Sequence, residues 1–272
     1  MQGKVALVTG AASGIGHALC RALAARGAQV IAADRDLEGA EALTEQLGPS
    51  ATPVALDVTD PDAFVDVVQG VVRRAGRLDM LFNNAGVGLA GQVRDLGLPQ
   101  WRRVFDVNVW GVVHGVHAAY PVMIEQGGGH IINTASGAGL VPRPGMVPYA
   151  AAKHAVVGLS TSLRAEAHPL GVRVSVACPG YVATKIMSST RYVGVDQARL
   201  TENIPVRPIS AEACAQAILR GVDRDQGVIV ISRLVQLEWA LYRLSPRIGV
   251  TLGRVRGRRF HDNRQSPPPG AD

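Results

Sequence analysis

The sequence predicts an α/β protein with a doubly wound parallel sheet. Three observations lead to this prediction: short β-branched runs alternate with stretches of helical periodicity over the first 180 residues, a glycine-rich loop follows the first run, and 47% of the 272 residues are hydrophobic. Strands that alternate with helices form parallel sheets covered on both faces, with right-handed crossovers. A chain of this length and composition buries a large core, which excludes a disordered protein.

Seven short runs are the expected strands of the sheet. The first, Val5–Val8, is apolar throughout, as strands covered on both faces are. In chain order the expected strands are residues 5–8, 30–33, 52–56, 80–82, 129–134, 173–177 and 227–231. Because no Gly/Ser linker or internal repeat divides the chain, we expect a single domain over residues 1–232 and a C-terminal extension over residues 233–264.

The expected helices begin and end at recognisable signals. Gly27 ends the helix 15–26, and Gly48 ends the helix 37–47. Asp60 is the expected N-cap of the next helix, with Pro61 at its first position. Further helices are expected over residues 99–125, 147–168 and 211–223.

Composition excludes several classes of protein. Cys20, Cys178 and Cys214 are too few and too scattered for a disulfide framework or a metal cluster, so we expect no metal. No run of 18 apolar residues would cross a membrane. A structured motif begins by Thr9 and leaves no room for a signal peptide, so a reducing cytoplasm is the expected compartment.

The glycine loop predicts a nucleotide site. It runs from Thr9 through Gly10, Ser13, Gly14 and Ile15 to Gly16, between the first strand and the first helix. Glycine lets a pyrophosphate approach the backbone, and the helix N-terminus offers free N–H groups. A plain tight turn would explain the glycines alone, but Asp34, 18 residues past Gly16 at the end of the second strand, favours the dinucleotide site of a Rossmann fold.

Asp34 favours NAD over NADP as the dinucleotide. Its carboxylate accepts hydrogen bonds from a ribose diol and repels a 2′-phosphate. Arg35 argues in the other direction, because a guanidinium there could bind that phosphate. Ser13 stands where an extra basic residue would have favoured NADP. We therefore expect NAD, with NADP as the alternative.

Four further motifs carry a family resemblance. They are Asn83-Asn84-Ala85-Gly86, Ser136, Tyr149-Ala-Ala-Ala-Lys153 and Pro179-Gly180, each placed after an expected strand or on the helix that follows one. In this order, and with the glycine loop, the sequence resembles the short-chain dehydrogenase/reductase family over residues 1–232. The resemblance implies a Rossmann-fold oxidoreductase that transfers a hydride between NAD(H) and a secondary alcohol or ketone.

The chemistry of the tyrosine and lysine can be argued from the residues. Tyr149 and Lys153 are four residues apart and share one face of a helix. A phenol with a pKa near 10 is a poor base at pH 7. We expect the ammonium, together with a positive nicotinamide, to lower the pKa of Tyr149 toward the working pH. Ser136 would hydrogen-bond the substrate oxygen. Taken alone, Tyr149 and Lys153 would instead be interpreted as an ordinary pair on the surface of a helix.

The resemblance implies roles for further residues. Asn108 would complete a Ser–Asn–Tyr–Lys tetrad and hold a water in the proton relay; the alternative is a buried amide bonded to backbone. Asp57 and Val58 would bind the adenine edge, Asn83 would line the cofactor cleft, and Lys153 would also bond the nicotinamide ribose. The remaining cofactor residues implied are Thr9, Gly10, Ser13, Gly14, Ile15, Gly16, Asp34, Arg35, Asn84, Ala85, Gly86, Tyr149, Pro179, Gly180, Val182 and Thr184.

A hydrophobic substrate is expected from the residues around the site. The segment from Lys185 to Ser210 lies where the family places a substrate lid. Apolar residues there and beside Ser136 favour a steroid-, retinoid-, terpenoid- or acyl-like alcohol, although they would equally pack the lid itself. They are Ala138, Leu140, Val141, Met146, Val147, Ile186, Met187, Tyr192, Val193 and Ile204, with Arg191 and Arg199 among them.

The C-terminal extension holds the charge excess of the chain. The net charge of +6 arises from residues 233–264, while basic and acidic residues balance elsewhere. Three interpretations compete: a helix covering the substrate pocket or an oligomer interface, an amphipathic anchor on an anionic membrane surface, and nucleic-acid binding, for which no module is recognisable. We favour the first. Residues 265–272, which include Pro267, are expected to be disordered.

Partners and alternative functions complete the expectations. Relatives assemble through the two long helices, so the resemblance implies a homo-oligomer, a dimer or tetramer. His114 and His117 on the first of these helices are interpreted as packing or interface residues rather than metal ligands. The alternatives to a cytoplasmic dehydrogenase are a catalytically idle member used for binding or regulation, against which the intact Tyr149 argues, and a membrane-surface reductase using NADP(H).

Overall fold

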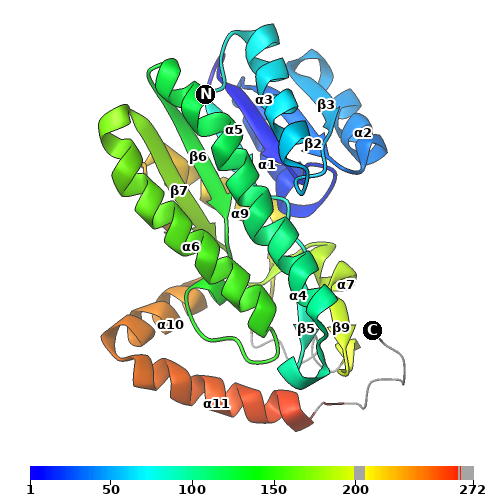
Figure 1. Ribbon diagram of the computed structural model, residues 1–272, viewed down its shortest axis with the longest axis vertical. Coiled ribbons are helices and arrows are strands. Elements are labelled where there is room, and N and C mark those ends of the chain that lie inside the picture. Colours follow the sequence, from blue (N-terminus) through cyan, green and yellow to red (C-terminus); the bar gives the residue numbers. More distant parts are fainter. Residues whose placement is uncertain (199–205, 263, 265–272) are drawn as a thin grey trace.

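A computed structural model describes residues 1–198, 206–262 and 264 as three layers around a central sheet (Figure 1). The sheet has seven parallel strands in the order β11-β7-β6-β4-β1-β2-β3. These are β1 (Val5–Thr9), β2 (Gln29–Asp34), β3 (Ala51–Ala55), β4 (Met80–Asn83), β6 (Gly129–Thr134), β7 (Val172–Cys178) and β11 (Val228–Val230). All seven strands predicted from the sequence are therefore in this sheet, and their ends differ by at most one residue.

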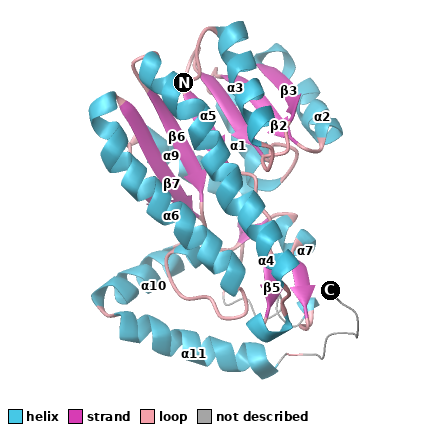
Figure 2. Cartoon of the chain, viewed as in Figure 1, coloured by secondary structure: helices cyan, strands magenta, loops and turns pink. Residues whose placement is uncertain are grey.

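Helices cover both faces of the sheet (Figure 2). On one face α1 (Gly14–Ala24), α2 (Leu37–Leu47) and α9 (Ala211–Asp223) pack through an apolar cluster that includes Leu19, Leu43 and Ile218. On the other face lie α3 (Pro61–Ala75), α5 (Gly111–Glu125) and α6 (Val147–Ala167), which bury Phe64 and Met123. The doubly wound fold predicted from the alternating pattern is confirmed.

The strand order reverses between β1 and β4, and this reversal positions the site. β1 pairs with β2 on one side and with β4 on the other, so the loops after β1 and β4 leave the sheet toward opposite faces. A crevice at the carboxyl ends of the strands is the usual ligand site of such sheets. The predicted N-cap is confirmed at α3, where the Asp60 carboxylate accepts the Ala63 N–H at 3.0 Å.

The helix expected over residues 99–125 is interrupted. α4 (Leu98–Phe105) and α5 are joined by a π-helical turn over Asp106–Trp110, in which the Gly111 N–H donates to the Asp106 carbonyl. A π-turn carries one extra residue, and such turns are frequent at functional sites. Periodicity alone predicts a continuous helix, because the apolar pattern continues through the turn.

Two small parallel sheets lie beyond the main one. β8 (Val182–Ala183) pairs with β10 (Ile209–Ser210), and β5 (Leu89–Gly91) pairs with β9 (Arg191–Val193). Together with α7 (Ile186–Ser189) they hold the ends of the expected lid segment. Arg199 and Ile204 of that segment lie outside the described residues, as does the tail 265–272.

The C-terminal extension forms two helices, α10 (Arg233–Leu244) and α11 (Pro246–Asp262). Val235 of α10 is buried against the body, where a Cβ on Gly137 would lie 2.8 Å from its Cγ2 atom. α11 crosses below the ends of α6 and α4 (Figure 1). Among the described residues no helix has the length and apolar character to cross a membrane. The homo-oligomer expected from the two long helices stays a prediction.

Candidate functional site

A cavity of about 1280 Å³ lies at the carboxyl ends of the strands. The loops after β1, β4, β6 and β7 contribute to it, together with the first turns of α1 and α6. The structure thereby brings together most of the site residues predicted from the sequence. Those that line the cavity are Gly10, Ser13, Gly14, Ile15, Asp34, Arg35, Asp57, Val58, Asn84, Ala85, Gly86, Ser136, Tyr149, Lys153, Pro179, Gly180, Val182 and Thr184.

The glycine loop leaves a cradle that side chains would fill. Gly10 and Gly14 have φ angles of +70° and +55°, a conformation that favours glycine. A Cβ on Gly10 would lie 2.9 Å from the Ala85 Cα atom, and one on Gly14 would lie 3.1 Å from the Thr184 Cβ atom. Ser13 begins α1 without a side-chain cap bond, so the first N–H groups of the helix face the cavity without that partner.

Asp34 shapes the loop from the end of β2. One carboxylate oxygen accepts the Ala12 N–H at 2.9 Å and the other accepts the Asp36 N–H at 3.0 Å. The carboxylate is half-buried, and each oxygen retains a further lone pair toward the cavity. The neighbouring Arg35 is exposed.

Three predicted cofactor residues lie behind the cavity wall rather than in it. Thr9 is buried, and its hydroxyl accepts the N–H groups of Asn84 and Ala85 at 3.0 and 3.1 Å. Gly16 packs so closely on Gly10 that a Cβ would lie 2.0 Å from the Gly10 carbonyl oxygen. Asn83 is buried and donates to the Asn133 side chain at 2.9 Å. These residues support the loops, and Asn84, not Asn83, faces the cavity.

Ser136, Tyr149 and Lys153 lie close together in the lining of the cavity. Ser136 caps the short turn after β6, where its hydroxyl accepts the Ala138 N–H at 3.1 Å. Lys153 is 3% exposed, donates to the Thr134 carbonyl at 2.8 Å, and places its Nζ atom 5.8 Å from the centre of the Tyr149 ring. The four-residue spacing therefore does put both side chains on one face of α6.

The pKa values follow burial more than charge. Burial raises the pKa of Tyr149, and a hydrogen bond from Ser136 acts in the opposite direction. Burial also lowers the pKa of Lys153 to about 8. Burial therefore outweighs the hydrogen bond in the Tyr149 pKa, and the expected lowering of this pKa by Lys153 together with a bound nicotinamide stays a prediction.

Asn108 sits in the π-helical turn and does not line the cavity. Its amide donates to the Val87 carbonyl at 2.9 Å, and its Oδ1 atom accepts the Val87 N–H at 3.1 Å. A Cβ on Gly86 would lie 2.8 Å from that Oδ1 atom and 3.5 Å from the Lys153 Nζ atom. The side chain therefore makes the buried backbone contacts named as the alternative, next to Lys153. Its place in a proton relay stays a prediction.

The two ends of the cavity differ in polarity. At the Asp34 end, Asp57 accepts both the Thr59 N–H and its hydroxyl, and these bonds lower the pKa of the carboxylate. Val58 lies beside it and its carbonyl is bonded to His114, a packing contact. At the other end Pro179, Gly180, Val182 and Thr184 follow β7.

The apolar flank only partly matches the expectation. Ala138, Met146, Ile186 and Tyr192 line the cavity. Leu140 and Val141 pack instead into the cluster beneath α10, Val193 is buried in the cluster of Leu89 and Val104, and Val147 is partly exposed outside the cavity. These side chains point away from the cavity, a difference that composition does not reveal.

Sequence reasoning missed the contribution of α11. Leu252, Val255, Arg256, Phe260 and Asp262 line the cavity, with Leu234 and Val235 of α10. Phe260 packs against Gly145, and Gly253 and Gly257 lie against Pro142 and Pro144. The glycine spacing of four in this helix was the available signal, since it predicts a close packing face.

The residues present fit a dinucleotide. The cradle over Gly10 and Gly14 would be filled by any side chain, the N-terminus of α1 is directed at it, and Asp34 keeps free lone pairs at the ribose position. Gly10, Ser13, Gly14 and Ile15 would hold the pyrophosphate. Among the described residues no cluster of His, Cys, Asp or Glu could hold a metal ion.

Comparison with known proteins agrees with this geometry. A family model described as short chain dehydrogenase matches residues 4–192. Cyclohexanol dehydrogenase of an Acinetobacter species is 37% identical over 189 residues, which cover 68% of this chain and 75% of the relative. D-threitol dehydrogenase of Mycolicibacterium smegmatis is 41% identical over 189 residues, covering 68% and 73%.

A solved structure extends the similarity along the chain. The structure of a short chain dehydrogenase/reductase from Burkholderia phymatum in complex with NAD has a TM-score of 0.84 and 29% sequence identity. The match covers 91% of this chain and 95% of that one.

Proposed function

The chain belongs to the short-chain dehydrogenase family of NAD(P)-dependent oxidoreductases acting on alcohols, and from that premise we propose that it interconverts an apolar secondary alcohol and its ketone with NAD(H). The observation that carries the proposal is the meeting of Ser136, Tyr149 and Lys153 in one cavity with the glycine cradle. When bound, the dinucleotide supplies the hydride acceptor or donor.

The proton chemistry falls to three side chains. In alcohol oxidation the Tyr149 phenolate would accept the hydroxyl proton of the alcohol, and the Ser136 hydroxyl would hold the substrate oxygen. Lys153, held by the Thr134 carbonyl, would stabilise the phenolate by its charge. Because burial raises the pKa of Tyr149, the phenol is protonated at pH 7 and is ready to act as the general acid in ketone reduction.

The cofactor preference follows from Asp34. Its two carboxylate oxygens are fixed by backbone N–H groups and remain half-exposed to the cavity, so they would accept the ribose hydroxyls and repel a 2′-phosphate. The exposed side chain of Arg35 is not held beside it by any described ion pair. The NAD in the related Burkholderia phymatum structure supports the same preference.

The apolar substrate class rests on the lining beyond Tyr149. Met146, Ile186 and Tyr192 from the body and Leu252, Val255 and Phe260 from α11 supply an apolar surface there. The two alcohols for which relatives are named, cyclohexanol and D-threitol, differ in polarity. The support for an apolar substrate therefore comes from the cavity lining.

The test is the variant Tyr149→Phe. We expect kcat/KM for cyclohexanol or another accepted alcohol, followed at 340 nm with NAD, to fall by about 10³-fold, with dinucleotide affinity unchanged. Tyr120→Phe is the matched control, because it removes the same group, a buried tyrosine hydroxyl, from a residue outside the cavity. Turnover of Tyr149→Phe at the wild-type rate would contradict the assignment.

A further inference from the structure

Two arginines that do not belong to the dinucleotide cradle also line the cavity. Arg143 lies in the loop before α6, and Arg256 lies on α11. Both donate to the same carboxylate, Glu238 of α10: Arg143 Nη2 to Oε2 at 2.7 Å, and Arg256 Nη2 to Oε1. The Glu238 side chain is 7% exposed, whereas those of Arg143 and Arg256 are 13% and 37% exposed. The carboxylate therefore lies behind the guanidiniums.

The arrangement leaves one positive charge uncompensated. Two guanidiniums share a single carboxylate, and no other carboxylate in the described part of the chain forms an ion pair with either. Each guanidinium has five N–H donors, of which one bonds Glu238. Asp262 also lines the cavity, but its exposed side chain is screened by water. The remaining donors suit a bidentate anion.

Apolar groups adjoin this charge and connect it with the reacting end. Leu252, Val255 and Phe260 line the same wall as Arg256. Pro144 and Met146 line it on the chain between Arg143 and Tyr149. Because Arg143 and Tyr149 are six positions apart, at most about 20 Å of backbone separates them. A ligand that touches both therefore needs an apolar body of moderate length.

We propose that Arg143 and Arg256 form an anion subsite, so that the substrate is an amphipathic carboxylate: an apolar alcohol whose far end carries a carboxyl group. This inference rests on the proposed function for the alcohol end. The carboxylate would take the free N–H donors of the two guanidiniums, with Glu238 held behind them as a shared acceptor.

A purely structural role for the triad would be to fasten α11, but α11 has other attachments. Arg264 forms a bidentate ion pair with Asp95 at 3.0 and 2.8 Å. Phe260 packs on Gly145, and the glycines of α11 lie on the loop prolines. Substitutions in the triad therefore leave the helix held at its C-terminal end.

The test measures binding without turnover. Calorimetry of the full-length protein in the presence of NAD compares hexanoate, octanoate and dodecanoate with their uncharged amides. We expect the best carboxylate to bind at least 10-fold more tightly than its amide, as charge-assisted hydrogen bonds imply. Arg256→Gln should bring this ratio close to one. Glu238→Gln should raise carboxylate affinity, because it removes the competing acceptor.

The control is Arg254→Gln. Arg254 is exposed on α11 outside the cavity, so the same charge is lost from the same helix and carboxylate affinity should stay within 2-fold. Should Arg256→Gln fail to fold, Arg143→Gln makes the same test from the body. Thermal melts of each variant identify a loss of fold.

Three results would overturn the subsite: equal binding of carboxylates and amides at every length, equal losses in Arg254→Gln and Arg256→Gln, or equal losses in Glu238→Gln and Arg256→Gln. The last is the signature of a fastening role. Octanoate selectivity in a protein that oxidises no alcohol would refute the proposed function and leave the subsite standing. Oxidation of neutral alcohols without selectivity for octanoate would refute the subsite and leave the proposed function standing.

Discussion

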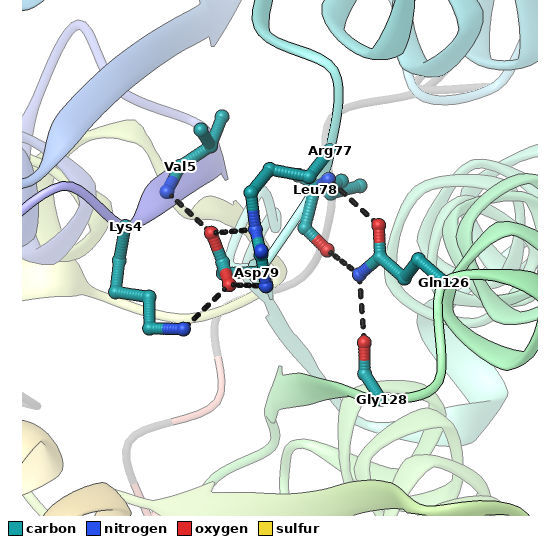
Figure 3. Close-up of polar contacts among 7 residues, drawn as sticks. All are labelled: Lys4, Val5, Arg77, Leu78, Asp79, Gln126 and Gly128. Carbon is teal, nitrogen blue, oxygen red and sulfur yellow. Dashed lines mark hydrogen bonds and ion pairs between the residues drawn. The ribbon is translucent and has the colours of Figure 1, made fainter.

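The two ends of the sheet treat buried charge in opposite ways. At the amino end, the 6%-exposed Asp79 accepts Lys4 at 2.9 Å, two N–H groups of Arg77, and the Val5 N–H (Figure 3). At the carboxyl end, the equally buried Lys153 donates to one neutral carbonyl, and no carboxylate in the described chain pairs with it. One charge is neutralised where it lies, and the other is kept available.

The amino end is satisfied in its backbone as well. The Gln126 side chain accepts the Leu78 N–H at 3.1 Å and donates to the carbonyls of Leu78 and Gly128 (Figure 3). At the carboxyl end the first N–H groups of α1 have no side-chain cap. This fold thus places its stabilising polar pairs at the amino end of the sheet. At the carboxyl end it leaves Lys153 and the first N–H groups of α1 with bonding capacity that a ligand can use.

The largest expected effect is at the carboxyl end. Lys153→Met should lower kcat/KM by about 10²–10⁴-fold, because the charge that stabilises the phenolate is lost. Burial lowers the pKa of Lys153 to about 8, which corresponds to a cost of about 3 kcal/mol for burying the ammonium. The lost bond to Thr134 offsets about 1 kcal/mol. Urea unfolding at pH 7 should therefore show a variant that is no less stable than wild type; a loss above about 2 kcal/mol would contradict this.

Asp79→Ala should show the opposite pattern. The substitution leaves the buried Val5 N–H without its acceptor and removes the carboxylate that pairs with Lys4 and Arg77. We therefore expect a loss of about 3 kcal/mol in unfolding free energy. Turnover per folded molecule should be unchanged. Asp223→Ala is the matched control, since it breaks an exposed pair with Arg26 and should cost less than about 1 kcal/mol. Equal losses in the two variants would erase the contrast.

His130 is the exception at the amino end and gives the pH dependence. Its Nε2 atom bonds the Ser175 hydroxyl at 2.9 Å, its Nδ1 atom has no hydrogen-bond partner among the described residues, and burial lowers its pKa to about 4. Between pH 6.5 and 4 the unfolded chain binds a proton that the folded chain does not, so stability falls as pH falls through this window. The difference corresponds to about 3 kcal/mol. His130→Gln should flatten the slope in urea titrations, and His168→Gln, on an exposed residue, should not.

The smallest effect concerns the cofactor. Asp34→Ala should lower the ratio of kcat/KM for NAD over NADP by about 10-fold, because a charged acceptor for the ribose is removed. Asp36→Ala, which removes the neighbouring carboxylate, should leave the ratio unchanged. A wild-type protein that is faster with NADP would contradict the assignment of NAD preference to Asp34 and would favour a role for Arg35 in binding the 2′-phosphate.

The sequence predicted most of the site because its signals are local. Gly10 and Gly14 follow a strand, and Tyr149 and Lys153 share a helical face, so spacing alone places them. The pair formed by Glu238 and Arg143 spans 95 positions and has no local signature. For the same reason the inward face of α11 was not predicted, although a helix of the C-terminal extension was expected to cover the pocket. Side-chain direction also escaped prediction, as the buried Thr9 illustrates.

The π-turn between α4 and α5 has a consequence for how the two halves of that helix can vary. One inserted residue rotates everything after it by about 100° relative to a regular helix. Asn108 can thus reach the Val87 backbone while Gly115, seven residues later, still presents its bare side to Asn83 and Phe64. Deleting a residue from the turn would rotate the Asn108 face relative to the Gly115 face. The π-turn therefore lets Asn108 bond the Val87 backbone beside the site while α5 keeps its packing against the core.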